Sequence, residues 1–404
     1  MELSERLLRE ELKKTKDQLA QSKPPSGWEP GVQLDGNTGS ITSRPTDQKL
    51  PDWRSLLLSW GFDPELYEVL DPVQIRTWDA FSKGENGIET KQLWYHRANI
   101  RRRTSADADA QALLTKIGKR RPLKIDPSVS TSSYFVVPLA DLQIGKGEGG
   151  GTPATIVRTE SVIDQAVTRF KELRKLGRKV DKVAILNAGD SIENACGWYS
   201  EQAFTVDLNR RDQVRIARRL FDSAIEAFTP LASEVIVSTC DSNHGENRVG
   251  NKSGTDQRDN AELEIFESLQ EAYAKNPSRY DHIKFVLPDD ASVTMLDLGI
   301  PIALAHGHRA PSGSSAAVKQ TNWWKGQSLG GHPAGDARLL LTGHYHHAAL
   351  QVDYGRTWIQ LPSLDGGSKW LTDKTGQHSP PGLLTFVTDP GSPLGWCDLE
   401  ILNP

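Results

Sequence analysis

The amino-acid sequence predicts an α/β fold for residues 129–404, preceded by a small helical N-terminal region. From Ser132 onward, short runs of β-branched and aromatic residues alternate with amphipathic stretches of helical period, which is typical of layered α/β domains. Five of the expected strands end in polar side chains. The length of 404 residues suggests two or three domains.

Residues 1–50 are expected to lie outside the folded domains. Leu8, Leu12, Thr15 and Leu19 repeat at alternating spacings of four and three, so residues 1–21 are predicted to form an amphipathic, coiled-coil-like helix. Such a helix either frays in solvent or joins copies of the chain into a homo-oligomer. Residues 22–50 are rich in Pro, Gly, Ser and Thr without periodicity, which predicts a flexible linker.

Residues 51–128 are predicted to form a small helical basic module, because apolar and aromatic residues cluster between Pro51 and Lys83. From Lys91 to Lys124 there are ten basic and two acidic residues, a net charge of +8 in a chain whose total is −4. Aromatic rings beside arginines can stack on bases while the guanidinium groups hold phosphates. The candidate nucleic-acid contacts are Trp94, Tyr95, Arg97, Arg101, Arg102 and Arg103. A solvated basic face is the alternative.

No apolar run is long enough to span a bilayer, and residues 1–21 lack the apolar segment of a secretory signal. Cys196, Cys240 and Cys397 lie far apart and show no paired spacing, which argues against a disulfide scaffold or a structural zinc site. We therefore expect a cytoplasmic protein without membrane contact.

The main domain is expected to begin with strands separated by helices and to end with strands that have fewer helices between them. The expected strands are Tyr134–Leu139, Val183–Asn187, Glu234–Thr239, Thr294–Leu298, Ile302–Ala305 and Arg338–Thr342. The expected helices are Ser161–Leu176, Arg211–Phe228 and Asn260–Ala274. This order predicts a mixed sheet or two stacked sheets.

Polar side chains with metal-binding chemistry follow five of these strands. The sequences at the strand ends include Asp141-Leu142-Gln143, Asp190–Glu193, Asn243–Glu246, His306-Gly307-His308 and His344–His347. Ligands gather at the carboxyl ends of strands in open α/β sheets, because neighbouring loops converge there. Carboxylates and imidazoles suit borderline divalent cations, and two such ions can clamp the oxygens of a displacement at phosphorus. The sequence therefore predicts a two-cation site made of Asp141, Asp190, Asn243, His306, His344 and His346.

The order Asp-x-(His), Gly-Asp-x-x-(Asp/Glu), Asn-His, His and Gly-His-x-His resembles the calcineurin-like metallophosphoesterase superfamily over about residues 132–365. The resemblance implies a four-layer α-β-β-α sandwich, with two sheets between layers of helices. It implies that Asp141 and His346 hold the first metal, that Asp190 bridges both metals, and that Asn243, His306 and His344 hold the second. It also implies catalytic roles for His244 as general acid, Glu193 as the residue that orients it, and Asn243 as a phosphate contact.

Three residues depart from the superfamily pattern. Gln143 stands where a metal-binding His is usual, Glu193 replaces the commoner Asp, and Ser242 replaces the Gly before Asn-His. The amide oxygen of Gln143 favours hard cations, so Mn²⁺ is the expected cofactor, with Mg²⁺, Fe²⁺ and Zn²⁺ as alternatives. Arg248 and His308 are further candidates for substrate binding.

The predicted function is that of a metal-dependent phosphodiesterase or nuclease acting on DNA, because a basic segment is joined to the metal-binding domain. The layout of the whole chain also resembles phage-encoded members of the superfamily. One alternative is a phosphatase or phosphodiesterase of small nucleotides. The other is a catalytically inactive nucleic-acid-binding protein that keeps the fold.

Overall fold

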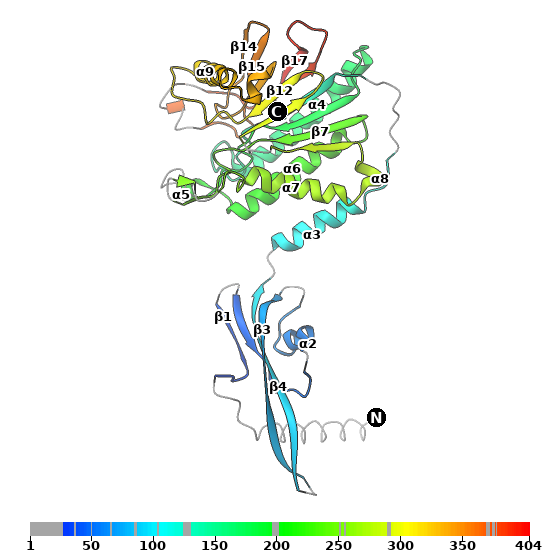
Figure 1. Ribbon diagram of the computed structural model, residues 1–404, viewed down its shortest axis with the longest axis vertical. Coiled ribbons are helices and arrows are strands. Elements are labelled where there is room, and N and C mark those ends of the chain that lie inside the picture. Colours follow the sequence, from blue (N-terminus) through cyan, green and yellow to red (C-terminus); the bar gives the residue numbers. More distant parts are fainter. Residues whose placement is uncertain are drawn as a thin grey trace. The chain divides into compact units, whose positions relative to one another are not determined.

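The structure is a computed structural model. It describes residues 27–35, 38–49, 51–64, 67–84, 87–102, 105–123, 131–195, 202–249, 252–253, 256–288, 292–368, 372–373, 376 and 378–404 (Figure 1). The chain divides into two compact units, Met1–Gln111 and Ala112–Pro404. The helix expected over residues 1–21 lies outside the described residues. In the described part of the chain, no helix is long and apolar enough to cross a membrane.

The first unit contains a four-stranded antiparallel sheet in the order β1-β2-β4-β3. Its elements are β1 (Gly31–Asp35), β2 (Thr38–Thr42), α2 (Trp53–Ser59), β3 (Tyr67–Gly84) and β4 (Gly87–Arg102). Helix α2 packs against the sheet through Leu57, which shares a small apolar core with Ile41, Ala98 and Ile100.

This sheet corrects two predictions. Among the described residues, the expected helical module of residues 51–128 is helical only in α2 and α3 (Ser105–Gly118), and the expected linker of residues 22–50 contains β1 and β2. In β4, the buried Ala98 and Ile100 alternate with the exposed Asn99 and Arg101. A period of two is that of a strand with one buried face. The clustered aromatic residues suggested helices, but the period of two along this segment indicates strands.

The second unit contains a six-stranded sheet in the order β10-β7-β6-β5-β16-β17. Its strands are β5 (Tyr134–Leu139), β6 (Lys182–Asn187), β7 (Glu234–Thr239), β10 (Ile283–Val286), β16 (Leu383–Thr388) and β17 (Trp396–Leu402). The first four are mutually parallel, and β16 and β17 are antiparallel to their neighbours. Helices α4 (Gly151–Lys175), α6 (Arg210–Phe228) and α7 (Ala261–Ala274) share an apolar core with one face of this sheet.

A five-stranded sheet in the order β11-β12-β13-β15-β14 forms the other half of this unit. Its strands are β11 (Val293–Asp297), β12 (Pro301–Ala305), β13 (Leu339–Thr342), β14 (Ala349–Asp353) and β15 (Arg356–Gln360). Helix α9 (Ala316–Leu329) and the 3₁₀ helix η1 (Pro333–Asp336) pack on it. The short elements are α5 (Gln202–Thr205), β8 (Arg248–Val249), β9 (Lys252–Ser253) and α8 (Pro277–Tyr280).

Alternating side chains join these layers. In β5, Phe135 belongs to the core under the helices, whereas Val136 belongs to a core shared with the five-stranded sheet. In β12, Leu304 enters that shared core, and Ala303 enters the core beside α9. Residues of both sheets therefore share one apolar core, and each sheet also shares a core with helices.

The predicted α/β class with more than one sheet is confirmed. The six strands expected from the sequence are present with bounds shifted by at most one residue. Helix α4 begins at Gly151 instead of the predicted Ser161. Its first turn contains Gly151 and Pro153, residues that weaken a helix signal in the sequence but are tolerated at a helix N-terminus.

Candidate metal centre

The polar loops after five strands meet at one site. Strands β5, β6 and β7 are parallel, and so are β12 and β13, so each group presents its carboxyl ends together. Asp141, Asp190 and His344 have φ angles of 50°, 53° and 78°. Left-handed backbone is costly for residues that carry a Cβ, and it clusters at functional sites. The fold therefore holds these three residues in conformations that the free chain avoids.

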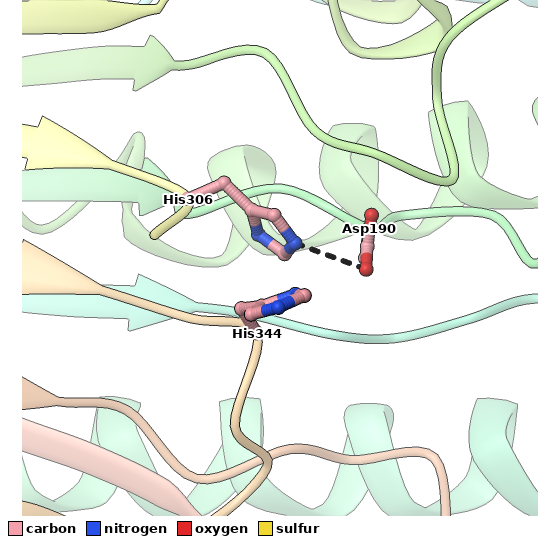
Figure 2. A group of neighbouring side chains, drawn as sticks. All are labelled: Asp190, His306 and His344. Carbon is pink, nitrogen blue, oxygen red and sulfur yellow. Dashed lines mark ion pairs between the residues drawn. The ribbon is translucent and has the colours of Figure 1, made fainter. Parts of the chain in front are cut away.

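Asp190, His306 and His344 form the centre of the site, and each offers one ligand atom within 4.8 Å of the others (Figure 2). His306 Nε2 lies 3.0 Å from Asp190 Oδ2 and 2.8 Å from Asn243 Oδ1. Asp190 and His306 are each only 1% exposed. A carboxylate, an amide and two imidazoles from four separate loops thus converge in a buried space.

The hydrogen bonding of His306 indicates what belongs between these groups. Its Nδ1–H donates to the carbonyl oxygen of Ala188 at 2.7 Å, so a neutral ring has its lone pair on Nε2. That lone pair faces oxygens of Asp190 and Asn243, an arrangement that requires a proton or a cation between them. Burial works to lower the pKa of His306, but Asp190 and Asp141 outweigh it and raise the pKa to about 10.

The neighbouring imidazole is held in the opposite state. Burial, together with the positive charge of His306, lowers the pKa of His344 to about 3, so its ring is neutral and keeps a free lone pair. The two rings have centroids 5.1 Å apart. Oxygen and nitrogen donors around a position that attracts positive charge fit a divalent cation of the manganese, iron or zinc type.

Asp141, Gln143 and His346 lie beside this centre, where the first metal is expected. Both carboxylate oxygens of Asp141 accept the backbone N–H of His344, at 3.1 and 3.0 Å, and His346 Nε2 is 3.4 Å from Asp141 Oδ1. Burial raises the pKa of Asp141 to about 6. Gln143 is engaged elsewhere, because its Oε1 accepts the ammonium of Lys146 at 3.1 Å.

Asp365 is a buried carboxylate of the site that the sequence interpretation missed. It lies five residues after β15, a strand that was not among those expected from the sequence, so reasoning from strand ends did not reach it. Its Oδ2 lies 3.3 Å from His346 Nδ1 and also binds Lys146. Its Oδ1 accepts the Ser363 hydroxyl at 2.7 Å and the Gly367 N–H at 3.0 Å. Asp365 therefore orients His346, as carboxylates commonly do behind metal-binding imidazoles.

His244 is held against the metal centre by two residues. Its backbone N–H donates to Asp190 Oδ1 at 2.9 Å. Its Nδ1 donates to the backbone carbonyl of Glu193 at 2.8 Å, and Glu193 Oε2 lies 3.5 Å away. The remaining ring nitrogen, Nε2, is 3.5 Å from Gln143 Nε2. Glu193 thus contacts the His244 ring, and its orienting role remains a prediction.

Glu262 is a second carboxylate that the sequence interpretation missed. It lies in the first turn of α7 and is fully buried, and burial raises its pKa. It accepts hydrogen bonds from the backbone N–H of Ser191 at 2.9 Å, from Asn187 Nδ2 at 2.6 Å and from the Ser242 hydroxyl at 2.8 Å. Ser242, which departs from the superfamily pattern, therefore links the loops after β6 and β7.

Arg248 and His308 lie on either side of Glu246. Arg248 Nε donates to Glu246 Oε2 at 2.8 Å, and His308 Nε2 lies 3.9 Å from Glu246 Oε1. The His308 ring centroid is 5.4 Å from that of His306, and burial lowers the His308 pKa to about 2. His308 is therefore a neutral neighbour of the centre, and substrate binding by either residue remains a prediction.

The candidate nucleic-acid contacts have partners within the first unit. Tyr95 is 1% exposed and stacks on Trp78 with a centroid separation of 4.2 Å, so it offers no open face to a base. The Arg97 guanidinium lies 4.6 Å from the Trp28 ring centroid, and Arg101 is paired with Glu68.

The remaining candidates are less engaged or lie outside the described residues. Trp94 is partly exposed, with Lys49 Nζ 6.0 Å from its ring centroid. Arg102 ends β4 with its side chain outside the described part, and Arg103 lies wholly outside it. The described contacts therefore correct the expected role of Tyr95 and leave the other residues as predictions.

Comparison with known proteins gives structural neighbours only. No protein-family model and no curated protein matches the sequence. A predicted phosphoesterase from Streptococcus pneumoniae is 13% identical over 64% of this chain and 86% of its own, with a TM-score of 0.26. An archaeal phosphodiesterase is 14% identical over 66% of this chain and 99% of its own, with a TM-score of 0.31.

A third neighbour is the zinc complex of Vps29 from Entamoeba histolytica. It is 14% identical over 66% of this chain and 98% of its own, with a TM-score of 0.27. Likeness at this level identifies no activity.

Proposed function

We propose that this chain is a metal-dependent phosphoester hydrolase with the four-layer architecture of the calcineurin-like superfamily. The observation that carries the proposal is the convergence of Asp190, Asn243, His306 and His344, whose donor atoms come from four loops. A cation held there would neutralise the charge that develops on a phosphoryl group and would position its oxygens.

The residues around that position have separate tasks in the proposed reaction. Asp190 would hold the cation and, through Oδ1, the backbone of His244. His244 would deliver a proton to the leaving oxygen, and the Glu193 carboxylate 3.5 Å from Nδ1 would stabilise the protonated ring. Asp365 would keep His346 in the orientation in which Nε2 faces Asp141.

We further propose that the substrate is a phosphodiester in DNA, which would make the protein a nuclease. The net charge of +8 over residues 91–124 supports this choice, because basic segments supply the sequence-independent attraction to nucleic acids. Hydrolysis of small nucleotides remains the alternative within the same chemistry. Binding of DNA without hydrolysis is the alternative outside it.

Hydrolysis of bis-p-nitrophenyl phosphate tests the proposed chemistry. With Mn²⁺ present, the wild-type protein is expected to turn the diester over, and EDTA is expected to stop it. His306→Ala removes one ligand and is expected to lower kcat by at least about 100-fold, whereas His332→Ala, at the half-buried histidine that caps η1, serves as the matched control. Turnover that survives both EDTA and His306→Ala would contradict the proposal.

The same assay on single-stranded DNA and on nucleotide monoesters separates the substrates. Cleavage of DNA supports the nuclease proposal. Inertness toward DNA with turnover of a monoester would replace it by the small-nucleotide alternative. Salt-sensitive DNA binding without hydrolysis of any substrate would favour the binding protein.

A further inference from the structure

Lys146 lies on the side of the centre where the first metal is expected, in contact with Gln143 and Asp365. A single turn brings it there, because the Lys146 N–H donates to the Gln143 carbonyl at 3.0 Å. The turn is tied down by isolated bridges from Ile144 to Ile192 and from Lys146 to Val206. The Lys146 ammonium then donates to Gln143 Oε1 at 3.1 Å. Because an ammonium can only donate, this contact fixes which end of the Gln143 amide is the oxygen.

Asp365 holds the ammonium in place. The Lys146 side chain is 13% exposed, and that of Asp365 is fully buried. One carboxylate oxygen of Asp365 contacts both Lys146 Nζ and His346 Nδ1. A buried ion pair with hydrogen bonds on both partners is a fixed part of the structure, because removing one partner leaves an uncompensated charge.

This arrangement weakens the position expected for the first metal in two ways. The oxygen of Gln143, which would have to replace a histidine ligand, is already used by Lys146. A fixed positive charge also lies on the same side as Asp141 and His346 and repels a dication there. Among the described residues, the only set of three carboxylate, histidine or cysteine ligands within 4.8 Å of one another is Asp190, His306 and His344.

We propose, on the basis of the function proposed above, that the protein binds one divalent cation tightly, at Asp190, Asn243, His306 and His344. The ammonium of Lys146, positioned by Gln143 and Asp365, supplies the positive charge of the other half of the site. The centre is then mononuclear at metal concentrations that saturate the tight position. Lys146 and Gln143 determine that stoichiometry, and a histidine at position 143 together with an uncharged residue at 146 is expected to create a second site.

Mn²⁺ titration of the full-length metal-free protein by calorimetry, with electron paramagnetic resonance on the same samples, measures the stoichiometry directly. The wild-type protein is expected to bind one Mn²⁺ tightly, with any second ion at least about 100-fold weaker, and to give the spectrum of an isolated ion. The double variant Gln143→His/Lys146→Met is expected to bind two ions with affinities within about tenfold of each other and to show spin coupling. Lys182→Met removes a lysine paired with Glu234 at the start of β6 and is expected to behave like the wild type.

Two tight, spin-coupled ions in the wild-type protein, or a single ion in a folded double variant, would overturn the inference. If the double variant misfolds and loses the tightly bound ion, the single variant Lys146→Met provides the test. This variant frees the Gln143 oxygen to bind a metal without introducing a histidine ring at position 143. A strengthened second ion in that variant supports the inference, and an unchanged one overturns it. If the wild-type protein has two sites of equal affinity and hydrolyses the diester, the inference fails but the proposed function stands. One tight ion with no turnover of any phosphoester would keep the inference and overturn the function.

Discussion

At the scale of single residues, the site shows how a fold assigns different tasks to chemically similar groups. His306 and His344 lie side by side, yet carboxylates raise the pKa of one to about 10 while burial and a neighbouring charge lower that of the other to about 3. Asp190 and Asp365 are both buried, but Asp190 faces the metal position and Asp365 faces the back of His346. Because both members of each pair have the same side chain, the groups around each residue decide its role.

Glu193 provides a prediction at this scale. Glu193→Gln keeps the size of the side chain but removes the negative charge 3.5 Å from His244 Nδ1, so the His244 ring loses the charge that would orient it toward the leaving oxygen. We expect kcat for a phosphodiester to fall by about 10- to 100-fold, with Mn²⁺ stoichiometry unchanged. Steady-state kinetics and metal titration measure these two quantities. Glu160→Gln, at an exposed position on α4, is the control, and an unaltered kcat in Glu193→Gln would remove the role assigned to Glu193.

At the scale of elements, the first turn of α7 connects the metal loops to the helical side of the unit. Asn260 caps the helix by accepting the Glu262 N–H, and its amide donates to the Ser242 carbonyl at 2.9 Å. Glu262 then gathers Asn187, Ser191 and Ser242. The ligands Asp190 and Asn243 are neighbours of Ser191 and Ser242 in the sequence. The N-terminus of one helix therefore positions two ligand loops.

Glu262→Gln tests that connection. In this variant an amide nitrogen replaces one carboxylate oxygen of Glu262. Every described partner of this carboxylate donates a hydrogen bond to it, so at least one buried donor would lose its acceptor. We expect the free energy of unfolding to fall by about 1–3 kcal/mol and the affinity for Mn²⁺ to fall as well. Chemical denaturation and metal titration measure the two effects. Glu264→Gln lies two residues further along the same helix, on a side chain that is 53% exposed and pairs with Arg210, and little change is expected there. Equal losses in both variants would show that the Glu262 contacts have no special role.

At the scale of the whole molecule, the candidate metal site belongs to one unit, whereas the basic segment is divided between the two. The candidate metal ligands all lie within Ala112–Pro404, whereas five of the ten basic residues of the segment belong to Met1–Gln111. Each unit has an apolar core of its own. Binding of a polyanion and hydrolysis of a phosphoester are therefore expected to be separable.

A shortened chain of residues 112–404 tests this separation. We expect it to melt cooperatively and to keep turnover of bis-p-nitrophenyl phosphate within a few-fold of the full-length value. Its affinity for single-stranded DNA is expected to be lower and to depend less steeply on salt, because fewer phosphates are neutralised. Fluorescence anisotropy over a salt series measures the slope for both chains. An unchanged slope would exclude residues 1–111 as a DNA contact surface.

Much of the catalytic half could be predicted from the sequence alone. The runs that became β5, β6, β7, β12 and β13 are short, apolar and followed within four residues by Asp, Asn or His, so both the strands and their candidate ligands are encoded locally. The strands of the first unit were also encoded locally, but their period of two was obscured by clustered aromatic residues. The signal for these strands was therefore present in the sequence, and predicting helices there misinterpreted it.

Only the tertiary structure decided which distant groups became partners. Lys146 and Asp365 lie 219 residues apart, and Ser191 and Glu262 lie 71 apart, so nothing in either segment signals the other. The sequence determined the kinds of ligand and the strand ends that carry them, because these depend on residue type and local period. Packing set the protonation state of each ligand and placed the ammonium beside the expected first metal position. Burial and neighbouring charges exist only once the two sheets have come together.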